Sequence, residues 1–310
     1  MEYDVIVVGS GAAGLAAALA AAHDGASVIV LEKSRWLGGT TAMSGAGTWV
    51  PGNHHMKAAG IEDSPEETLR YIKGVAPPGW EASEQELWQV LAEQSAPMLR
   101  FLEDETPLRF ELVNHPDPYA DLPGGRPFGR MVSTTPLSKF LLGRWWNRVR
   151  ASVKTQLFTY RELVDGVLKN PVRGALGMAP TLLWRLLTAR VGAGNALVIG
   201  LVRGCLDKGC RIELEAPVHR LVMDGDAVAG VEATVGGERR TIRAARGVVL
   251  ATGGFDWNRD LMARYFPGID LTGAPDTNTG DGQVMAAEVG AELAHMDQAL
   301  ISPATFTIYE

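Results

Sequence analysis

Three glycines and one acid near the N-terminus have the types and spacing of a nucleotide-binding turn. Residues 3–33, YDVIVVGSGAAGLAAALAAAHDGASVIVLEK, contain Gly9, Gly11 and Gly14 as G-x-G-x-x-G. The first glycine permits a tight turn, the second lets backbone amides approach a pyrophosphate, and the third lets a helix pack closely on the sheet. Glu32 follows Gly14 by 18 residues and is placed to accept hydrogen bonds from an adenosine ribose.

The elements that must position these residues are a strand, a turn, an alanine-rich helix and a second strand. Residues 5–8 are apolar on both faces, which is typical of a buried parallel strand. Because the elements and the terminal acid occur in the right order, the segment predicts a dinucleotide-binding unit. It does not separate FAD from NAD. The predicted contacts in this unit are Gly9, Ser10, Gly11, Ala13, Gly14, Glu32 and Lys33.

The loop after the second strand favours a flavin. Residues 37–49, LGGTTAMSGAGTW, have no helical or strand period. Their glycines allow close backbone approach, and their hydroxyls can bond phosphate, ribityl or ring-edge atoms. A planar isoalloxazine needs such a flat, donor-lined bed, whereas a merely flexible linker would not be flanked by tryptophan and proline. The predicted contacts here are Gly39, Thr40, Thr41, Ala42, Ser44, Gly45 and Gly47.

Composition and charge restrict the class of protein. The 310 residues are 46% hydrophobic and 21% charged, with a formal net charge of -7, so nucleic acid is not an expected partner. Cys205 and Cys210 are expected to be structural. His54 and His55 are interpreted as solvent or loop residues, and no metal site is predicted. The first residues lack the pattern of a signal peptide, which predicts a cytoplasmic location.

Three further segments carry candidate functional residues. In YADLPGGRPFGR, residues 119–130, Tyr119 precedes a Pro-Gly-Gly turn and can move a proton if its neighbours lower its pKa. In ARGVVLATGGFDWN, residues 245–258, a buried strand is broken by two glycines. In NTGDG, residues 278–282, Asp281 begins a helix whose first turn can face a phosphate or act only as a cap.

These segments together resemble the flavoproteins of the fumarate reductase and 3-ketosteroid dehydrogenase superfamily. The pattern GGTTAxSGxxxWxPxN, which begins at Gly38, is most similar to the 3-ketosteroid Δ1-dehydrogenases. The resemblance is dense in residues 3–53, 119–130 and 247–297. It implies FAD as cofactor, and it adds contacts to the adenosine diphosphate part at Val218, Ala251, Thr252 and Gly253, with Asp281 near the phosphate or ribityl chain.

The resemblance also implies a reaction. An FAD-dependent dehydrogenase of this kind desaturates a carbon–carbon bond next to a ketone in a small, apolar, steroid-like substrate and passes electrons to an external acceptor. Tyr119 would remove the proton or support the base, while hydride transfers to flavin N5. Two alternatives stay open: a fumarate-reductase-like enoate reductase, and a non-catalytic flavin-binding fragment.

The predicted fold class is α/β: a Rossmann-type FAD-binding domain with a parallel sheet, a small antiparallel meander and a helical insertion. The FAD-binding domain is expected over residues 1–292, with the insertion at about 60–205. Residues 293–310 are expected to begin a truncated substrate domain, so that the chain is a fragment without a complete active site. Helices in 134–190, rich in leucine, tryptophan and arginine, suit a peripheral membrane contact or a substrate entrance, although packing on the domain is favoured.

Overall fold

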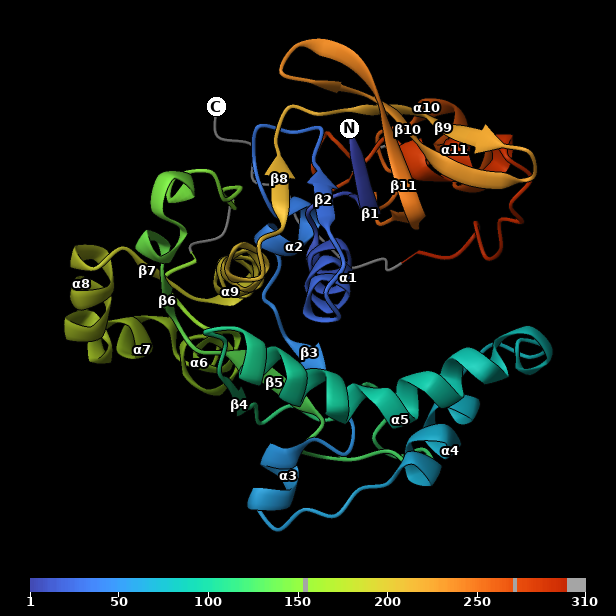
Figure 1. The fold of residues 1–310 in the computed structure, drawn as a ribbon. Coiled ribbons are helices and arrows are strands. Elements are labelled where there is room, and N and C mark those ends of the chain that lie inside the picture. The colour runs from blue at the N-terminus through green and yellow to red at the C-terminus, as the bar shows by residue number, and fades with distance from the viewer. Residues whose placement is uncertain (153–155, 270–271, 300–310) are drawn as a thin grey trace.

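A six-stranded sheet forms the centre of the chain, which a computed structural model describes over residues 1–152, 156–269 and 272–299 (Figure 1). Four strands are parallel at the centre and one edge, and two antiparallel strands complete the other edge. In spatial order they are β8 (Arg211–Glu213), β2 (Val28–Leu31), β1 (Glu2–Val8), β11 (Glu238–Leu250), β10 (Ala227–Val235) and β9 (Val218–Asp224). The predicted parallel sheet with a small antiparallel meander is therefore confirmed.

Strand β11 belongs to both parts of this sheet. Its first half pairs antiparallel with β10, from Glu238 opposite Val235 to Arg243 opposite Gly230. Its second half runs parallel to β1 and ends with Leu250 opposite Val8. Glycines with positive φ lie at both meander turns: Gly225 between β9 and β10, and Gly236 and Gly237 between β10 and β11. The same strand thus fixes the register of the meander against the dinucleotide-binding unit.

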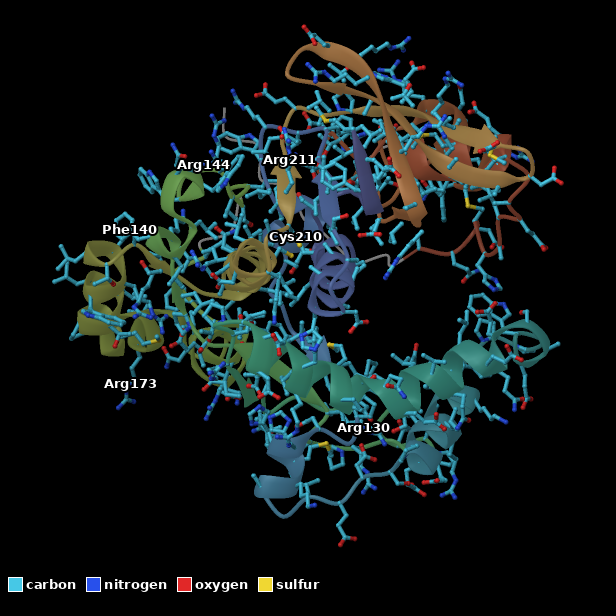
Figure 2. The ribbon with its side chains drawn as sticks, viewed as in Figure 1. Arg130, Phe140, Arg144, Arg173, Cys210 and Arg211 are labelled. Atoms are coloured by element: carbon cyan, nitrogen blue, oxygen red, sulfur yellow. The ribbon has the colours of Figure 1, made fainter. Side chains whose placement is uncertain are left out.

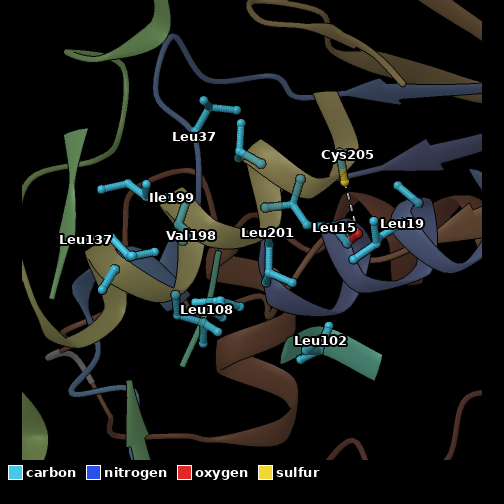
Figure 3. Packing of buried hydrophobic residues seen from close by; sticks show 14 of the residues in the cluster. Leu15, Leu19, Leu37, Leu102, Leu108, Leu137, Val198, Ile199, Leu201 and Cys205 are labelled. Atoms are coloured by element: carbon cyan, nitrogen blue, oxygen red, sulfur yellow. Dashed lines mark hydrogen bonds between the residues drawn. The ribbon is translucent and has the colours of Figure 1, made fainter. Parts of the chain in front are cut away.

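Both faces of the parallel strands are buried, as their continuous apolar sequence requires. Val7 faces a core cluster shared with α1 (Ala12–His23) and α9 (Ala193–Asp207). Ile6 and Val8 face a second cluster with the meander and with Met285 of α11 (Asp281–Glu288). Figure 3 shows Leu15 and Leu19 of α1 packed beside Leu201 and Cys205 of α9.

A separate lobe lies away from the central sheet in Figure 1. It contains the three-stranded sheet β3 (Thr48–Trp49), β5 (Met131–Thr134) and β4 (Phe110–Leu112), together with helices α3 (His54–Ala58), α4 (Pro65–Val75) and α5 (Glu81–Glu105). Ser64 caps α4, because its side chain accepts a hydrogen bond from the amide of Glu67. Helix α5 is a single helix with Pro97 inside it.

Short strands interrupt the segment predicted to be entirely helical. Within residues 134–209, β6 (Leu137–Ser138) pairs with β7 (Arg190–Val191). Two-residue strands leave no period in the sequence, so this pairing could not be predicted. The other elements there are η1 (Lys139–Trp145), α6 (Tyr160–Glu162), η2 (Leu163–Val167), α7 (Pro171–Gly177) and α8 (Ala179–Leu187). The remaining helices are α2 (Gly39–Met43) and α10 (Arg259–Tyr265).

Helix α2 corrects the expectation that residues 37–49 have no regular structure. It is one helical turn that follows Gly38, whose φ of 101° only glycine adopts readily. The end of the predicted substrate domain, residues 300–310, lies outside the described residues. Among the helices that the structure describes, none combines the length and the apolar character needed to cross a bilayer.

Candidate functional site: a dinucleotide pocket

The glycine turn between β1 and α1 brings three chain segments into close contact. Gly9 has a φ of 105°, and a Cβ there would lie 2.3 Å from the carbonyl oxygen of Ala251. A Cβ on Gly14 would lie 2.1 Å from the carbonyl oxygen of Gly9. Both distances are far below van der Waals contact, so glycine is required at each position. The close packing predicted for Gly14 is confirmed, although this residue does not line the pocket.

The N-terminus of α1 faces the pocket with little side-chain capping. Gly11 is the N-cap residue and has no side chain to satisfy the first amides. Thr41 supplies one acceptor, since its Oγ1 lies 3.0 Å from the amide nitrogen of Ala12. The first N–H groups of a helix have no intrahelical partners, and an anion such as a pyrophosphate suits them.

Glu32 directly follows β2 and is largely used by the protein itself. Its Oε2 accepts hydrogen bonds from the amide of Ser10 at 3.0 Å and from Ser10 Oγ at 2.6 Å. Its Oε1 accepts from the amide of Ser34 at 2.8 Å. A carboxylate can accept about four hydrogen bonds, so Glu32 keeps capacity for one ribose hydroxyl. Ser10 Oγ in turn accepts from the amide of Gly38 at 3.0 Å, which ties the loop to the turn.

A cavity of about 250 Å³ lies at the carboxyl ends of β1 and β2. Parallel strands place ligand sites at this edge of a sheet. The cavity is at the small end of ligand pockets, and it is open to one side. The predicted residues that line it are Gly9, Ser10, Gly11, Ala13, Glu32, Lys33, Gly39, Thr40, Thr41, Val218, Ala251, Thr252, Gly253 and Asp281.

The far wall of the cavity contains residues that the sequence did not indicate. Asn278 is 7% exposed, and its Nδ2 donates to Thr40 Oγ1 at 3.2 Å. Thr277, Met285 and Ala216 also line the cavity. Asn278 adjoins the predicted TGDG motif, and this proximity is the signal that could have found it.

Lys33 and Asp281 connect the two walls. Lys33 Nζ lies 2.8 Å from Asp281 Oδ2 and 2.5 Å from Thr279 Oγ1. Asp281 is the first residue of α11 and is preceded by Gly280 as N-cap, so it does not serve as the plain N-cap considered from the sequence. Both side chains are partly exposed.

Four predicted flavin contacts lie in the same loop but outside the cavity: Ala42, Ser44, Gly45 and Gly47. Ala42 is fully buried in the core. Gly45 and Gly47 pack against the ring of Tyr160, where a Cβ would lie 2.9 Å and 2.7 Å from ring carbons. Ser44 Oγ donates to the carbonyl of Thr41 at 2.8 Å. A flavin contact at these four positions stays a prediction.

Tyr119 lies in the separate lobe and not on the cavity. Its side chain is 54% exposed, and its backbone amide donates to the hydroxyl of Tyr71 at 3.3 Å. The catalytic role of Tyr119 therefore stays a prediction, because the residue does not line the cavity.

A buried charge network holds the segment that carries Tyr119. The guanidinium of Arg130, fully buried, donates twice to Asp63, at 2.7 and 2.8 Å, and once to Asp117, at 2.9 Å. Asp117 also accepts from Trp49 Nε1 at 2.7 Å and from the amide of Arg126 at 2.9 Å. Figure 2 shows Arg130 in the lobe of α3, α4 and α5.

Two opposing effects set the pKa of Asp63. Burial, the largest single effect, raises it, while the hydrogen bonds and charge of Arg130 lower it, with help from the amide of Gly52 and from Arg126. The lowering effects together prevail, so the pKa of Asp63 lies below its ordinary value.

The interpretation of His54 and His55 as solvent or loop residues was wrong. They are the first two residues of α3, both half-buried, and both rings face the carboxylate of Glu103. Both side chains reach Glu103 because they begin α3 and Glu103 lies beside its first turn. The spacing of the two histidines in the sequence does not indicate this tertiary contact.

The parallel strands, the glycine turn and the cavity at the strand ends define a Rossmann-type dinucleotide-binding protein. A family model described as an FAD binding domain matches residues 4–308, so the chain belongs to the FAD-binding domain family and its predicted cofactor, FAD, is confirmed.

Two of the curated relatives are named as dehydrogenases of ring compounds that carry an oxo group. A 3-oxosteroid 1-dehydrogenase from Mycobacterium tuberculosis is 35% identical over 97% of this chain and 56% of the relative. A 4-oxocyclohexanecarboxylate 2-dehydrogenase from Sinomonas cyclohexanicum is 38% identical over 98% of this chain and 53% of the relative. The chain thus spans about half the length of the curated relatives it matches.

Solved structures agree with this placement. The 3-ketosteroid Δ1-dehydrogenase of Sterolibacterium denitrificans, in complex with 1,4-androstadiene-3,17-dione, superposes with a TM-score of 0.82 at 32% identity, over 96% of this chain and 56% of that one. A flavocytochrome c3 fumarate reductase gives 0.64 at 25% identity, over 97% of this chain and 45% of that one. The predicted resemblance to this superfamily is confirmed.

Proposed function

We propose that the chain is the FAD-binding part of a dehydrogenase that desaturates a carbon–carbon bond adjacent to a ketone. The observation that carries this proposal is the dinucleotide pocket, whose glycine turn, helix N-terminus and Glu32 at the end of β2 suit an FAD. The bound flavin supplies the electron-accepting chemistry. The protein's own residues hold it through backbone amides, Glu32 and the hydroxyls of the 38–44 loop.

The substrate we propose is a small apolar ring ketone of steroid-like shape. Its support comes from the names of the relatives, which act on 3-oxosteroids or 4-oxocyclohexane carboxylates, and from the steroid in the solved neighbour. A fumarate-reductase-like enoate reductase is the second candidate, favoured by the flavocytochrome neighbour and by a more distant relative named NADH:fumarate oxidoreductase. Competition assays with a 3-ketosteroid and with fumarate distinguish the two.

Tyr119 is the residue we propose to remove the substrate proton or to support the base that does. Tyr119 is more than half exposed, which leaves the phenol accessible, and its backbone amide is held by the hydroxyl of Tyr71. Tyr119→Phe removes only the hydroxyl. In a protein that reduces dye, this variant should lose at least about a hundredfold in kcat while keeping its flavin spectrum. An unchanged kcat would remove Tyr119 from the mechanism.

A peripheral membrane contact is proposed for the flank formed by η1, α7 and α8. Large apolar side chains are exposed there, including Leu176 at 70% and Leu187 at 76%. Figure 2 shows Phe140, Arg144 and Arg173 on the same flank. Apolar and basic side chains together suit an anionic lipid surface. Flotation with anionic vesicles tests it: binding should fall in Leu176→Asp/Leu187→Asp, and equal flotation of both proteins would refute it. An external electron acceptor and a cytoplasmic location stay predictions.

The first experiment is a visible absorption spectrum of the purified chain before and after denaturation. Flavin bands that change on denaturation would support the FAD site in this chain, and dye reduction dependent on a 3-ketosteroid would support the dehydrogenase. Retained flavin without dye reduction would favour the non-catalytic alternative. A protein that stays colourless after incubation with FAD would overturn the proposal.

A further inference from the structure

A second cluster of side chains that can do chemistry lies in the separate lobe, away from the dinucleotide cavity. His54 Nε2 is 2.6 Å from Glu103 Oε2, and His55 Nε2 is 3.2 Å from Glu103 Oε1. The two imidazole rings lie close together, with their centroids 4.1 Å apart and their planes tilted by 40°. Neither the fold nor the proposed reaction needs this arrangement, and none of the three residues lines the cavity.

The elements that carry the cluster hold it in place before any ligand arrives. Asn53 caps α3 by accepting from the amide of Met56 at 3.0 Å, and its Nδ2 donates to the carbonyls of Val50 and Gly129. Glu103, near the end of α5, is oriented by the amide of Phe110, which donates to its Oε1 at 2.8 Å. A carboxylate fixed in this way is typical of a metal ligand with outer-shell support.

The donor atoms have the chemistry and spacing of a transition-metal site. One ligand atom from each of the three residues lies within 4.8 Å of the other two. The side chains of His54, His55 and Glu103 are 22%, 26% and 11% exposed, so the site is sheltered but open to solvent. His54 uses only one of its ring nitrogens: Nε2 faces Glu103, while the buried Nδ1 has no hydrogen-bond partner among the described residues.

Comparison with the other histidines of the described chain shows that this grouping is unusual for the molecule. His23 pairs with Glu105, and His295 with Glu84, each as one imidazole beside a carboxylate. Within residues 1–152, 156–269 and 272–299, only His54, His55 and Glu103 bring three such ligands together.

We propose that His54, His55 and Glu103 bind one divalent transition-metal ion, with zinc as the favoured ion. Two imidazoles and a carboxylate are an ordinary zinc ligand set, and a three-ligand site leaves one position for water. Because two ligands come from α3 and one from α5, the ion would join the two helices and stabilise the lobe. The proposal does not depend on flavin binding or on dehydrogenase activity.

Titration of the metal-free protein with zinc chloride in a calorimeter tests the proposal, with cobalt(II) as a spectroscopic substitute. We expect one site per chain, visible-band absorption of the cobalt form, and a higher melting temperature with zinc. His55→Ala and Glu103→Gln should each weaken zinc binding at least about tenfold and abolish the zinc-dependent rise in melting temperature. The matched control is His23→Ala, which removes a histidine that faces a single glutamate and should bind zinc like the parent.

The melting temperatures of the metal-free variants separate loss of ligand from loss of fold. Glu103→Asp retains a carboxylate and should recover part of the affinity that Glu103→Gln loses. The proposal would be overturned if the parent bound zinc no more tightly than His55→Ala, or if His23→Ala weakened binding as much as His55→Ala.

Discussion

The nucleotide-binding turn requires glycine at two positions, because a Cβ at either would clash with a backbone carbonyl. At Gly14 a Cβ would lie 2.1 Å from the Gly9 carbonyl, and at Gly9 a Cβ would lie 2.3 Å from the Ala251 carbonyl. Backbone atoms cannot move aside as a flexible side chain can. The turn therefore fixes how closely α1, β1 and the 251–253 segment approach, and that approach sets the shape of the pocket.

Gly14→Val should separate α1 from the turn. We expect the free energy of unfolding to fall by about 1–3 kcal/mol, as for other overpacked sites, and the flavin content of the purified protein to fall sharply. Gly166→Ala is the control, since a Cβ there meets no atom within 4 Å. Chemical denaturation and the flavin-to-protein absorbance ratio are the measurements. Unchanged flavin content in Gly14→Val would show that the pocket still binds flavin when α1 lies farther from the turn.

Asp63→Asn should make the protein less stable at neutral pH and less sensitive to acid. The pKa of Asp63 is lower in the folded protein than its ordinary value. Its stabilising contribution is therefore complete above the unfolded pKa of about 3.9 and is lost as the pH falls through the lower folded pKa. Breaking a buried ion pair costs about 3–5 kcal/mol.

The measurement is urea denaturation of parent and variant at neutral pH and at several values below pH ~4. The difference in stability should be largest at neutral pH and should shrink with acid. Asp24→Asn, an exposed position at the end of α1, is the control. A difference that stayed constant down to the lowest pH would contradict the assigned role of Asp63.

Individual residues also mark the limit of reasoning from the sequence. Fourteen predicted contacts line the cavity because they belong to local motifs, in which spacing along the chain determines the geometry. Asn278 adjoins the TGDG motif, but the motif does not encode its tertiary contact with Thr40 at the cavity. Likewise, Gly45 and Gly47 do allow another group to lie close to the backbone, but in the structure that group is the ring of Tyr160.

At the scale of elements, α9 and the turn that follows it are held against α1 by small residues and by two thiols, Cys205 in α9 and Cys210 in the turn. A Cβ on Gly204 would lie 2.7 Å from Thr106 Cγ2 and 3.2 Å from a Leu19 methyl. Cys205 Sγ donates to the carbonyl of Leu15 at 3.3 Å, and Cys210 Sγ to that of Ala18 at 3.7 Å. Both cysteines are free and buried, as the expected structural role requires.

Native protein should resist thiol reagents. A hydrogen bond with Cys210 and burial both raise the pKa of Cys205, so its thiolate is scarce at neutral pH. We expect almost no labelling by a disulfide reagent in the folded state and labelling of both cysteines in urea. The labelling rate should rise in Gly14→Val if α1 moves away from α9. Rapid modification of the folded parent would show that the two helices separate readily.

The sequence predicted whether a segment is a helix or a strand where its hydrophobic pattern extended over many residues. The buried run of β1, the capped helix α4 and the meander turns were all visible as periods or as start and stop signals. Helix α2 and the β6–β7 pair were not, because each has five residues or fewer and exists through contacts with distant segments. Such elements carry too little local information for any period to appear.

At the scale of the whole molecule, the pocket is built from segments near both ends of the described chain, before residue 42 and after residue 215. Its walls come from the first helix, from β2, from the start of β9 and from residues 277–285. A ligand that binds these walls together should stabilise the folded state as a unit.

FAD should therefore raise the melting temperature of the chain. At a concentration one hundred times its Kd, a ligand that binds only the folded state adds about 2.7 kcal/mol. Differential scanning fluorimetry of flavin-stripped protein with FAD, and with NAD as the matched comparison, measures this. Glu32→Ala should reduce the shift. An equal response to NAD and FAD would mean that the pocket reads only the shared adenosine diphosphate.

The central sheet cannot be completed until β11 has been synthesised, because β1 pairs with β11 along one edge. Strand β1 leaves the ribosome before β11, and Val8 pairs with Leu250, which is made about 240 residues later. At ordinary elongation rates, that interval is on the order of ten seconds or more. During it β1 can pair with β2 on one side only, and its other edge is open to other chains. Nascent chains that pause before residue 250 should therefore be the species that chaperones hold.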